Sequence, residues 1–350
     1  MPGADDELTY AKAGVDFDRE SAAIKALVRT LGGTRSGGGA RPLDLPGHFA
    51  GAVRIGDLAL VLCTDGVGTK MLVAQAMGRW DTVGIDCIAM NVNDAVCIGA
   101  EPVAFVDYLA VNHAEPDVMA AIGRGLAEGA RQANVAIVGG ETATLPEMVH
   151  GYDLAGTCLA VAPVDRLVLG TATAPGDVLI GLPSSGIHSN GLTLARKAVA
   201  QAGLALTDTA PELEGARIGD ALLTPTRIYV KDVLRALERV EVHGLAHVTG
   251  GGVLNVPRIN PAHHYVLERM PEPPAVFRLV QRLARASERE MHKTFNMGVG
   301  FVLAVPASAE DDALQALASA GAFRLGRVEA GRAGVRIPER KLEYEGAKGH

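Results

Sequence analysis

The sequence predicts a mixed α/β (α+β) protein of two domains, and three observations support this prediction. Its 350 residues exceed the usual size of one domain, and 48% of them are hydrophobic, enough for two cores. Short apolar runs alternate with helical patterns from residue 58 to 161, and again from 178 to 328. Between them, Pro163 to Pro175 has the composition of a linker. We therefore expect a mobile N-terminal arm at 1–50, a first domain at 51–168 and a second at 169–350.

The arm contains one helical pattern and one glycine-rich segment. Ala22–Leu31 is expected to form a short helix. Residues 32–39 are mostly glycine, which predicts either a lid over a binding site or a disordered tail; composition favours neither.

The first domain should alternate strands and helices. Gly99, followed by Pro102, is typical of a helix end and closes the helical pattern that begins at Ile85. The expected strands are Leu58–Cys63, Val103–Val111, Val135–Val138 and Leu154–Val161, and the expected helices are Met71–Met77, Ile85–Ile98 and Asp117–Ala133.

The second domain shows the same alternation. Its expected strands are Val178–Leu182, Leu245–Val248, Tyr265–Leu267, Gly298–Val305 and Phe323–Val328. Its expected helices are Leu192–Ala202, Pro225–Leu237, Ala275–Ala284 and Ala309–Ala320.

Composition argues against several classes of protein. The net charge of −7 and the absence of a basic block argue against nucleic-acid binding. No apolar stretch approaches the length of a membrane span, and the acidic N-terminus differs from a signal peptide. The four cysteines form no Cys-x-x-Cys pair, which predicts reduced thiols in a cytoplasmic protein.

The segment Thr64–Lys70 carries the strongest chemical signal. It follows an apolar run and precedes a helical pattern, so we expect a strand-to-helix turn. Gly66 and Gly68 let the backbone approach a ligand, and the following helix N-terminus favours an anion. Asp65 is suited to hold a metal ion and Lys70 to neutralise a phosphate. The pattern predicts a site for metal-bound nucleotide phosphates; the alternative is a tight turn with solvated charges.

Polar residues also share one side of the helix expected at Ile85–Ile98. Asp86, Asn93 and Asp94 stand at i, i+7 and i+8, which places them on one stripe. A Mg²⁺ ion would satisfy Asp65, Asp86 and Asp94 together, whereas the alternative is a polar face with Asp86 as a cap.

Glu141 extends this acidic set, because it follows Gly139 and Gly140 at an expected strand end, where ligands collect in α/β proteins. It is a further candidate for contact with metal or water, or simply a loop acid. In contrast, the spaced glycines at 123–129 lie inside a helical pattern and do not fit a dinucleotide-binding turn.

Two glycine-containing turns in the second half are further candidates. Residues 184–191 follow a strand and precede a helix, and they contain His188, which suits proton transfer or stabilisation of charge. Residues 249–252 form a second strand-end turn suited to a phosphate or ribose. The candidates for substrate binding in these turns are Ser185, Ser189, Asn190, Thr249, Gly250 and Gly251.

Together these blocks resemble the phosphoribosylformylglycinamidine cyclo-ligase (aminoimidazole ribonucleotide synthetase) family. The resemblance runs from Tyr10–Asp16 almost to the C-terminus and includes Thr64–Lys70, Gly84–Asp86, Val92–Asp94, Gly99–Pro102, Gly139–Thr142, Ser185–Gly191, Thr224–Tyr229, Thr249–Gly252 and Thr294–Gly300. It implies an N-terminal sheet that forms a barrel with a second subunit in a homodimer, and a C-terminal α/β domain.

The resemblance also implies a reaction and its participants. ATP and formylglycinamidine ribonucleotide would give aminoimidazole ribonucleotide, ADP and phosphate, with Mg²⁺ as cofactor. It would assign His188, Asp65 and Asp94 to catalysis, and Thr64, Gly66, Gly68, Thr69, Lys70, Asn93, Gly139, Gly140 and Glu141 to the nucleotide. Other ATP-using enzymes of the superfamily, such as thiamine-phosphate kinase, are the alternatives, together with a non-catalytic nucleotide-binding protein.

Overall fold

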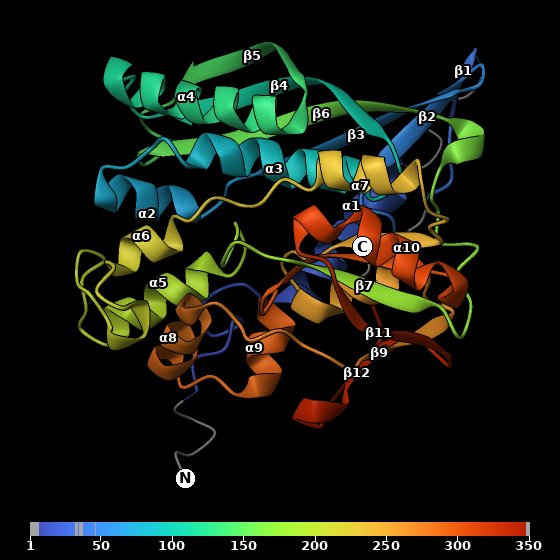
Figure 1. The fold of residues 1–350 in the computed structure, drawn as a ribbon. Coiled ribbons are helices and arrows are strands. Elements are labelled where there is room, and N and C mark those ends of the chain that lie inside the picture. The colour runs from blue at the N-terminus through green and yellow to red at the C-terminus, as the bar shows by residue number, and fades with distance from the viewer. Residues whose placement is uncertain (1–6, 32–33, 35–37, 46, 348–350) are drawn as a thin grey trace.

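Two β-sheets organise the chain, and the computed structural model describes residues 7–31, 34, 38–45 and 47–347 (Figure 1). Most of the glycine-rich segment predicted as a lid or tail lies outside these residues, so that prediction stays open. The N-terminal half contains α1 (Phe17–Leu31), β1 (Ala40–Pro42), β2 (Gly51–Ile55), β3 (Leu58–Gly66), α2 (Lys70–Met77), α3 (Val83–Val96), β4 (Glu101–Val111), α4 (Pro116–Ala133), β5 (Ala136–Thr144) and β6 (Tyr152–Pro163).

The N-terminal sheet has the strand order β1-β2-β3-β6-β4-β5. Only β4 and β5 run parallel within it, and α4 makes the crossover between them. Helix α3 packs against the inner face and against α4. Along β3 the side chains alternate, so Ala59 and Val61 are fully buried towards the helices while Leu58 and Leu62 are 49% and 48% exposed on the outer face.

The C-terminal half surrounds a seven-stranded sheet with the order β13-β12-β9-β11-β7-β10-β8. Its strands are β7 (Val178–Pro183), β8 (Gly244–His247), β9 (His263–Leu267), β10 (Val299–Val305), β11 (Phe323–Ala330), β12 (Gly334–Ile337) and β13 (Leu342–Glu345). Its helices are α5 (Leu192–Gln201), α6 (Ile218–Leu222), α7 (Val230–Leu237), α8 (Ala275–Ala284), α9 (Glu288–Thr294) and α10 (Glu310–Ala316). All seven residues of β10 are buried, as its unbroken apolar sequence requires.

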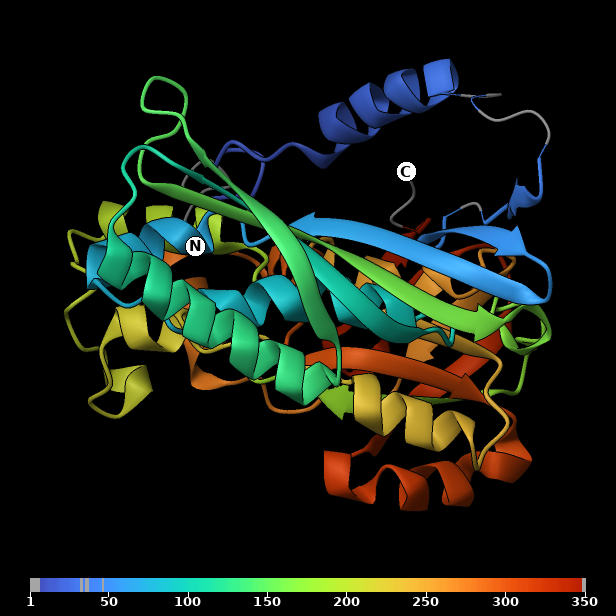
Figure 2. The same cartoon turned by 90° about the horizontal axis from the view of Figure 1, so that it is seen from above.

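The two halves meet along α2 and α3. Helix α3 contacts α7 and β8, and α2 contacts α5 and α6. Figure 1 shows α3 between the N-terminal sheet above it and the C-terminal half below. In Figure 2, α1 lies to one side of the N-terminal sheet, away from α3 and α4. No helix in the described part of the chain is long and apolar enough to cross a bilayer.

The mixed α+β class and two sheet-containing regions are as predicted, but three local expectations were wrong. Strand β3 continues to Gly66, so the turn before α2 is shorter than expected. Strand β5 also continues through Gly139 and Gly140 to Thr144, and Glu141 therefore lies inside an exposed edge strand instead of beyond its end. The β3–β6 ladder extends to Gly66, and the β5–β4 ladder continues past Gly139 and Gly140 to Thr144, which a single sequence does not reveal.

The third difference concerns residues 225–237, predicted as one helix. Helix α7 begins only at Val230, because the preceding backbone bonds to α3 instead of to itself. Thr226 and Tyr229 donate their N–H groups to Asp86 and Asn93 at 2.7 and 2.9 Å. The short elements β1, β2, α6, α9, β12 and β13 were not predicted.

Candidate functional site

The turn between β3 and α2 leaves a glycine-lined helix N-terminus exposed. Gly68 has φ +67° and open space around it, which is a left-handed conformation that glycine adopts without strain. The first turn of α2 is closed by Met71 and Leu72, whose N–H groups donate to the carbonyls of Gly68 and Thr69 at 3.1 and 3.2 Å. The peptide dipoles of the helix favour an anion at this end. Thr69 bonds to Thr193 of α5 at 3.0 Å, so this turn touches the C-terminal half. Its backbone can therefore face an anion held between the halves.

Thr64 and Asp65 lie in the last part of β3 beside this turn. Thr64 donates to the carbonyl of Gly156 at 2.8 Å, while Asp65 accepts from the N–H of Gly66 at 2.7 Å. Asp65 is half-buried. In the sheet register Asp65 pairs with Gly156, Gly156 with Asp107, and Asp107 with Gly140. Asp107 was not predicted as a candidate, although a carboxylate within the apolar run Val103–Val111 was a usable signal.

Lys70 and Asp86 form a fully buried ion pair. The Lys70 ammonium lies 2.9 Å from Asp86 and also donates to the carbonyls of His188 and Thr224, at 3.1 and 2.7 Å. Both side chains are 0% exposed. Burial lowers the pKa of Lys70, and the charge of Asp86 opposes that effect. This structure therefore directs the Lys70 ammonium towards the protein interior, not towards a ligand at the turn.

Asn93 and Asp94 of α3 also face the C-terminal half, as the predicted polar stripe requires, whereas Asn91 donates to the carbonyl of Asp65 in the N-terminal half. Asn93 donates to the carbonyl of Arg227 at 2.9 Å. Asp94 lies 2.8 Å from Nδ1 of His247, with 19% of its side chain exposed against 0% for His247. His247 ends β8 and also lies 3.5 Å from Asn93. We did not predict a role for His247, although a histidine at a strand end, just before a glycine-containing turn, was a usable signal.

Asp65, Asp86 and Asp94 are not assembled as one metal site. Among the residues that the structure describes, no three His, Cys, Asp or Glu side chains are grouped to hold a metal ion. Asp86 is already neutralised by Lys70 and accepts two hydrogen bonds from Thr226. Asp65 and Asp94 have the hard oxygen donors that Mg²⁺ prefers, and neither is sealed from solvent. These two residues fit a magnesium ion better than Asp86 does.

His188 is held as a buried, neutral imidazole. It is 1% exposed, and its backbone lies in the left-handed region with φ +61°, which is uncommon outside glycine. Its Nε2 accepts from the Ser185 N–H at 3.2 Å, so the proton of the neutral ring sits on Nδ1. Nδ1 has no partner among the described residues. Burial, with the nearby charges of His247, Lys70 and Arg227, lowers the pKa of His188 well below its usual value.

Asn296 holds the His188 loop through two side-chain hydrogen bonds. Its amide donates to the carbonyl of Gly186 at 2.9 Å and accepts from Ser184 at 2.8 Å. Ser189 Oγ is buried without a partner in the described residues, while Asn190 reaches the sulfur of Met90 on α3 at 3.9 Å.

The turn Thr249–Gly252 lies beside the His188 loop. Asn255 donates to the carbonyls of Thr249, Gly250 and Gly252, at 3.3, 3.1 and 2.9 Å, and thereby fixes the turn. A side chain at Gly250 would stand 2.8 Å from Asn190 Oδ1, so the two predicted substrate-binding turns are neighbours. The sequence did not specify this proximity.

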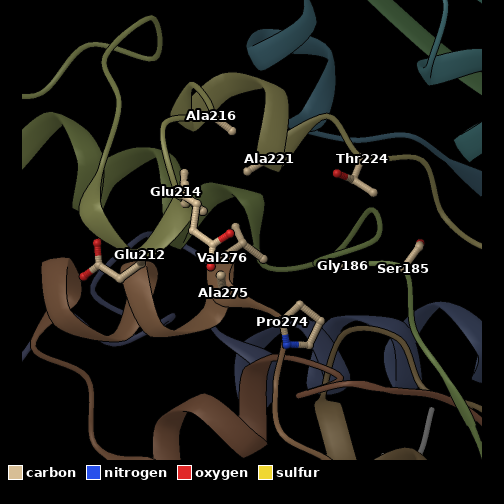
Figure 3. Close-up of a pocket in the computed structure, with 11 residues that line it drawn as sticks. Ser185, Gly186, Glu212, Glu214, Ala216, Ala221, Thr224, Pro274, Ala275 and Val276 are labelled. Carbon is tan, nitrogen blue, oxygen red and sulfur yellow. The ribbon is translucent and has the colours of Figure 1, made fainter.

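A pocket of about 310 Å³ opens next to the His188 loop (Figure 3). Ser185 and Thr224 line one side of it, and Glu212 and Glu214 lie on the opposite side with the apolar residues Pro274–Val276. Glu212 is paired with Arg282. The pocket therefore combines hydroxyl groups and two carboxylates, one of them paired with an arginine, with an apolar wall.

Comparisons with known proteins cover both halves of the chain. The AIR synthase related protein N-terminal domain model matches residues 47–162, and the corresponding C-terminal domain model matches residues 174–337. A phosphoribosylformylglycinamidine cyclo-ligase of Methanocaldococcus jannaschii is 50% identical over 91% of this chain and 90% of its own length. One from Thermococcus kodakarensis is 49% identical over 94% of this chain and 98% of its own.

Solved structures with lower identity share the fold. A thiamine-monophosphate kinase from Stenotrophomonas maltophilia has a TM-score of 0.61 at 19% identity, covering 83% of this chain and 90% of its own. The hydrogenase maturation protein HypE of E. coli has a TM-score of 0.60 at 20% identity, covering 83% and 86%. At this identity the likeness supports the architecture alone.

Proposed function

The chain belongs to the phosphoribosylformylglycinamidine cyclo-ligase family, and we propose that it closes the imidazole ring of formylglycinamidine ribonucleotide at the expense of ATP. The products are aminoimidazole ribonucleotide, ADP and phosphate, as part of purine biosynthesis. The observation that carries the proposal is identity near 50% to cyclo-ligases over both halves of the chain. The exposed α2 turn and the His188 loop meet where those halves join.

The chemistry explains why ATP is required. A formamide oxygen is a poor leaving group, so the formyl carbon resists attack. Transfer of the γ-phosphoryl group to that oxygen produces a good leaving group. The ribose-bearing nitrogen then attacks the carbon, phosphate departs with the formyl oxygen, and loss of a proton completes the aromatic ring. The enzyme must therefore hold nucleotide and substrate in line and exclude water.

We assign the nucleotide phosphates to the turn before α2. The backbone of Gly68 and Thr69 would offer hydrogen-bond donors, the N-terminus of α2 a favourable dipole for anions, and Gly66, which has no side chain, a close approach. Asp65 and Asp94 would hold Mg²⁺, which supplies positive charge against the phosphates when bound. Asp65 and Gly140 lie in the same cross-strand register, on β3 and β5. Three strand spacings, about 14 Å, separate them. An extended nucleotide can cover that distance, so we also assign Gly139 and Glu141 to it.

His188 acts in this proposal as a neutral hydrogen-bond donor. Its Nδ1–H has no protein partner in the described residues, and its lowered pKa keeps the ring uncharged at neutral pH. A donor that is already oriented in a dry site stabilises negative charge as it develops on the transferring group or the formyl oxygen. Its left-handed backbone is consistent with a functional constraint.

The substrate would bind on the C-terminal side of the junction. Thr249–Gly251 suit its phosphate because they form a rigid glycine turn, and Ser185, Ser189 and Asn190 supply hydroxyl and amide groups next to it. The buried Ser189 hydroxyl gains a partner if substrate binds there. The pocket at Ser185 and Thr224 offers adjoining volume for the substrate.

The outer face of the N-terminal sheet supports a homodimer. Apolar side chains that are about two-fifths to one-half exposed project from β3 and β4, including Leu58, Leu62, Val106 and Tyr108. A sheet face of this kind is normally covered, and a second copy would cover it with an identical face. We also place the protein in the cytoplasm, because all four cysteines are buried thiols without disulfides.

A coupled assay of ADP release tests the function. The purified protein should release ADP when given ATP, Mg²⁺ and formylglycinamidine ribonucleotide, and not with ATP alone. Thiamine monophosphate serves as the control substrate, since the fold is shared with a kinase for that compound. Absence of ADP with the first substrate, or equal ADP with both, would reject the proposal.

A further inference from the structure

Lys70 differs from a phosphate-binding lysine in how its donors are used. An ammonium group has three N–H donors. Here the three face Asp86, the carbonyl of His188 and the carbonyl of Thr224, all within 3.1 Å. The side chain is also completely buried. In this arrangement no donor remains for a nucleotide.

The acceptors of Lys70 belong to segments that the chain brings together only by folding. Asp86 lies on α3 in the N-terminal half, whereas His188 and Thr224 lie in the C-terminal half. Asp86 in turn accepts from both the N–H and the hydroxyl of Thr226, at 2.7 and 2.6 Å. One ion pair therefore ties two loops of the C-terminal half to α2 and α3.

One of those loops carries the imidazole assigned to catalysis. The Lys70 ammonium holds the His188 carbonyl while the Ser185 N–H holds its ring at Nε2. Ser185 is itself anchored, because its hydroxyl donates to the Pro225 carbonyl at 2.6 Å, next to the segment that Lys70 and Asp86 fix. The backbone and the ring of His188, a residue at φ +61°, are thus restrained by two different partners.

We propose that Lys70 and Asp86 are positioning residues that aim His188 across the junction of the two halves, and that they do not bind phosphate or magnesium. This inference rests on the proposed function. The nucleotide would then depend on the backbone of the turn before α2, and loss of the ion pair would reduce turnover without weakening nucleotide binding.

The test compares turnover with nucleotide binding in Lys70→Met. We expect kcat to fall by about 100-fold, the scale of an ångström-sized misplacement. The Kd of a non-hydrolysable ATP analogue, measured by calorimetry with Mg²⁺, should change by less than about threefold, well below the tenfold step that corresponds to 1.4 kcal/mol. A Kd raised tenfold or more would overturn the proposal. Lys231→Met, on the surface of α7, is the matched control and should change neither quantity.

A second variant covers the case in which Lys70→Met does not fold. Lys70→Met with Asp86→Asn removes both charges while leaving an oxygen for Thr226, and it should show the same division between kcat and Kd. Wild-type kcat in this variant would refute a positioning role.

A double-mutant cycle separates positioning from general destabilisation. In a His188→Ala background, Lys70→Met should lower the remaining kcat by less than about threefold, because residues that act as a unit are not additive. A further 100-fold loss would contradict the proposal. If wild-type protein fails to release ADP, the proposed function fails, whereas the nucleotide Kd of Lys70→Met still decides whether this lysine binds phosphate.

Discussion

Two acidic residues of α3, Asp86 and Asp94, bond to the C-terminal half of this protein, and their contacts differ in exposure. The Lys70–Asp86 pair is 0% exposed on both sides, whereas Asp94 beside His247 retains 19% exposure. The first contact has every donor of the ammonium occupied, while the second presents a carboxylate that a ligand can reach. Both acids lie on the same side of one helix, so burial and partners distinguish the acid sealed in an ion pair from the acid that solvent can reach.

The largest effect on stability is expected when the sealed contact is broken. Lys70→Met leaves the Asp86 carboxylate buried without its counterion, which should lower the free energy of unfolding by about 3–5 kcal/mol. Chemical denaturation followed by circular dichroism measures this. Lys70→Met combined with Asp86→Asn should recover much of the loss, since both charges are removed while an oxygen remains to accept from Thr226. If the single variant loses less than about 1 kcal/mol of unfolding free energy, the buried pair stabilises the fold no more than an exposed ion pair would.

Asp94→Asn should affect activity instead of stability. Loss of a charge that supports the nucleotide and its metal is expected to lower kcat/KM by about 10²-fold, equivalent to about 2.7 kcal/mol. The melting temperature should stay within a few degrees, because the side chain is partly exposed and an amide still accepts from His247. Wild-type turnover in Asp94→Asn would remove this residue from the site.

His247→Asn should have a smaller effect, because asparagine can still donate to Asp94. We expect about a tenfold rise in the Mg²⁺ concentration for half-maximal activity, as for a residue that orients a metal ligand. His247→Leu, which lacks the donor, should show the larger shift. Equal behaviour of the two variants would indicate that the hydrogen bond at 2.8 Å does not orient Asp94.

The smallest effect concerns pH. Since the pKa of His188 is lowered in the folded protein, the unfolded chain binds a proton that the folded chain does not, and stability falls as pH drops below about 6.5. The slope contributed by one such group is at most about 1.4 kcal/mol per pH unit. His188→Asn should flatten the decline measured between pH 7 and about 5.5. An unchanged slope would show that His188 titrates normally.

His243 provides a control of opposite sign. Burial alone would lower its pKa, but Asp177 and Glu241 raise it above the usual value. Its contribution is therefore present at low pH and lost as pH rises through the folded pKa. His243→Asn should steepen the acid decline that His188→Asn flattens.

Much of the fold was predictable from local patterns. The helical spacing of residues placed Asp86, Asn93 and Asp94 on one stripe of α3. The helix at Ala275–Ala284 was predicted with its observed bounds. The exposed strands β1 and β2, with three and five residues, were missed because they are too short to show a period. Residues 225–229 were predicted as helix because nothing local shows that their N–H groups bond to α3.

By itself, the sequence determined the mixed α+β architecture, the helix periods, the presence of a turn between β3 and α2, and family membership, because each depends on residue types at short spacings. Only the tertiary structure decided which charges face a ligand. Lys70 and Asp86 match a phosphate and metal pattern in sequence, yet folding places them against each other and against two distant carbonyls. A buried ammonium must satisfy its charge and its three donors where it lies, and that requirement can be known only when the neighbours in space are known.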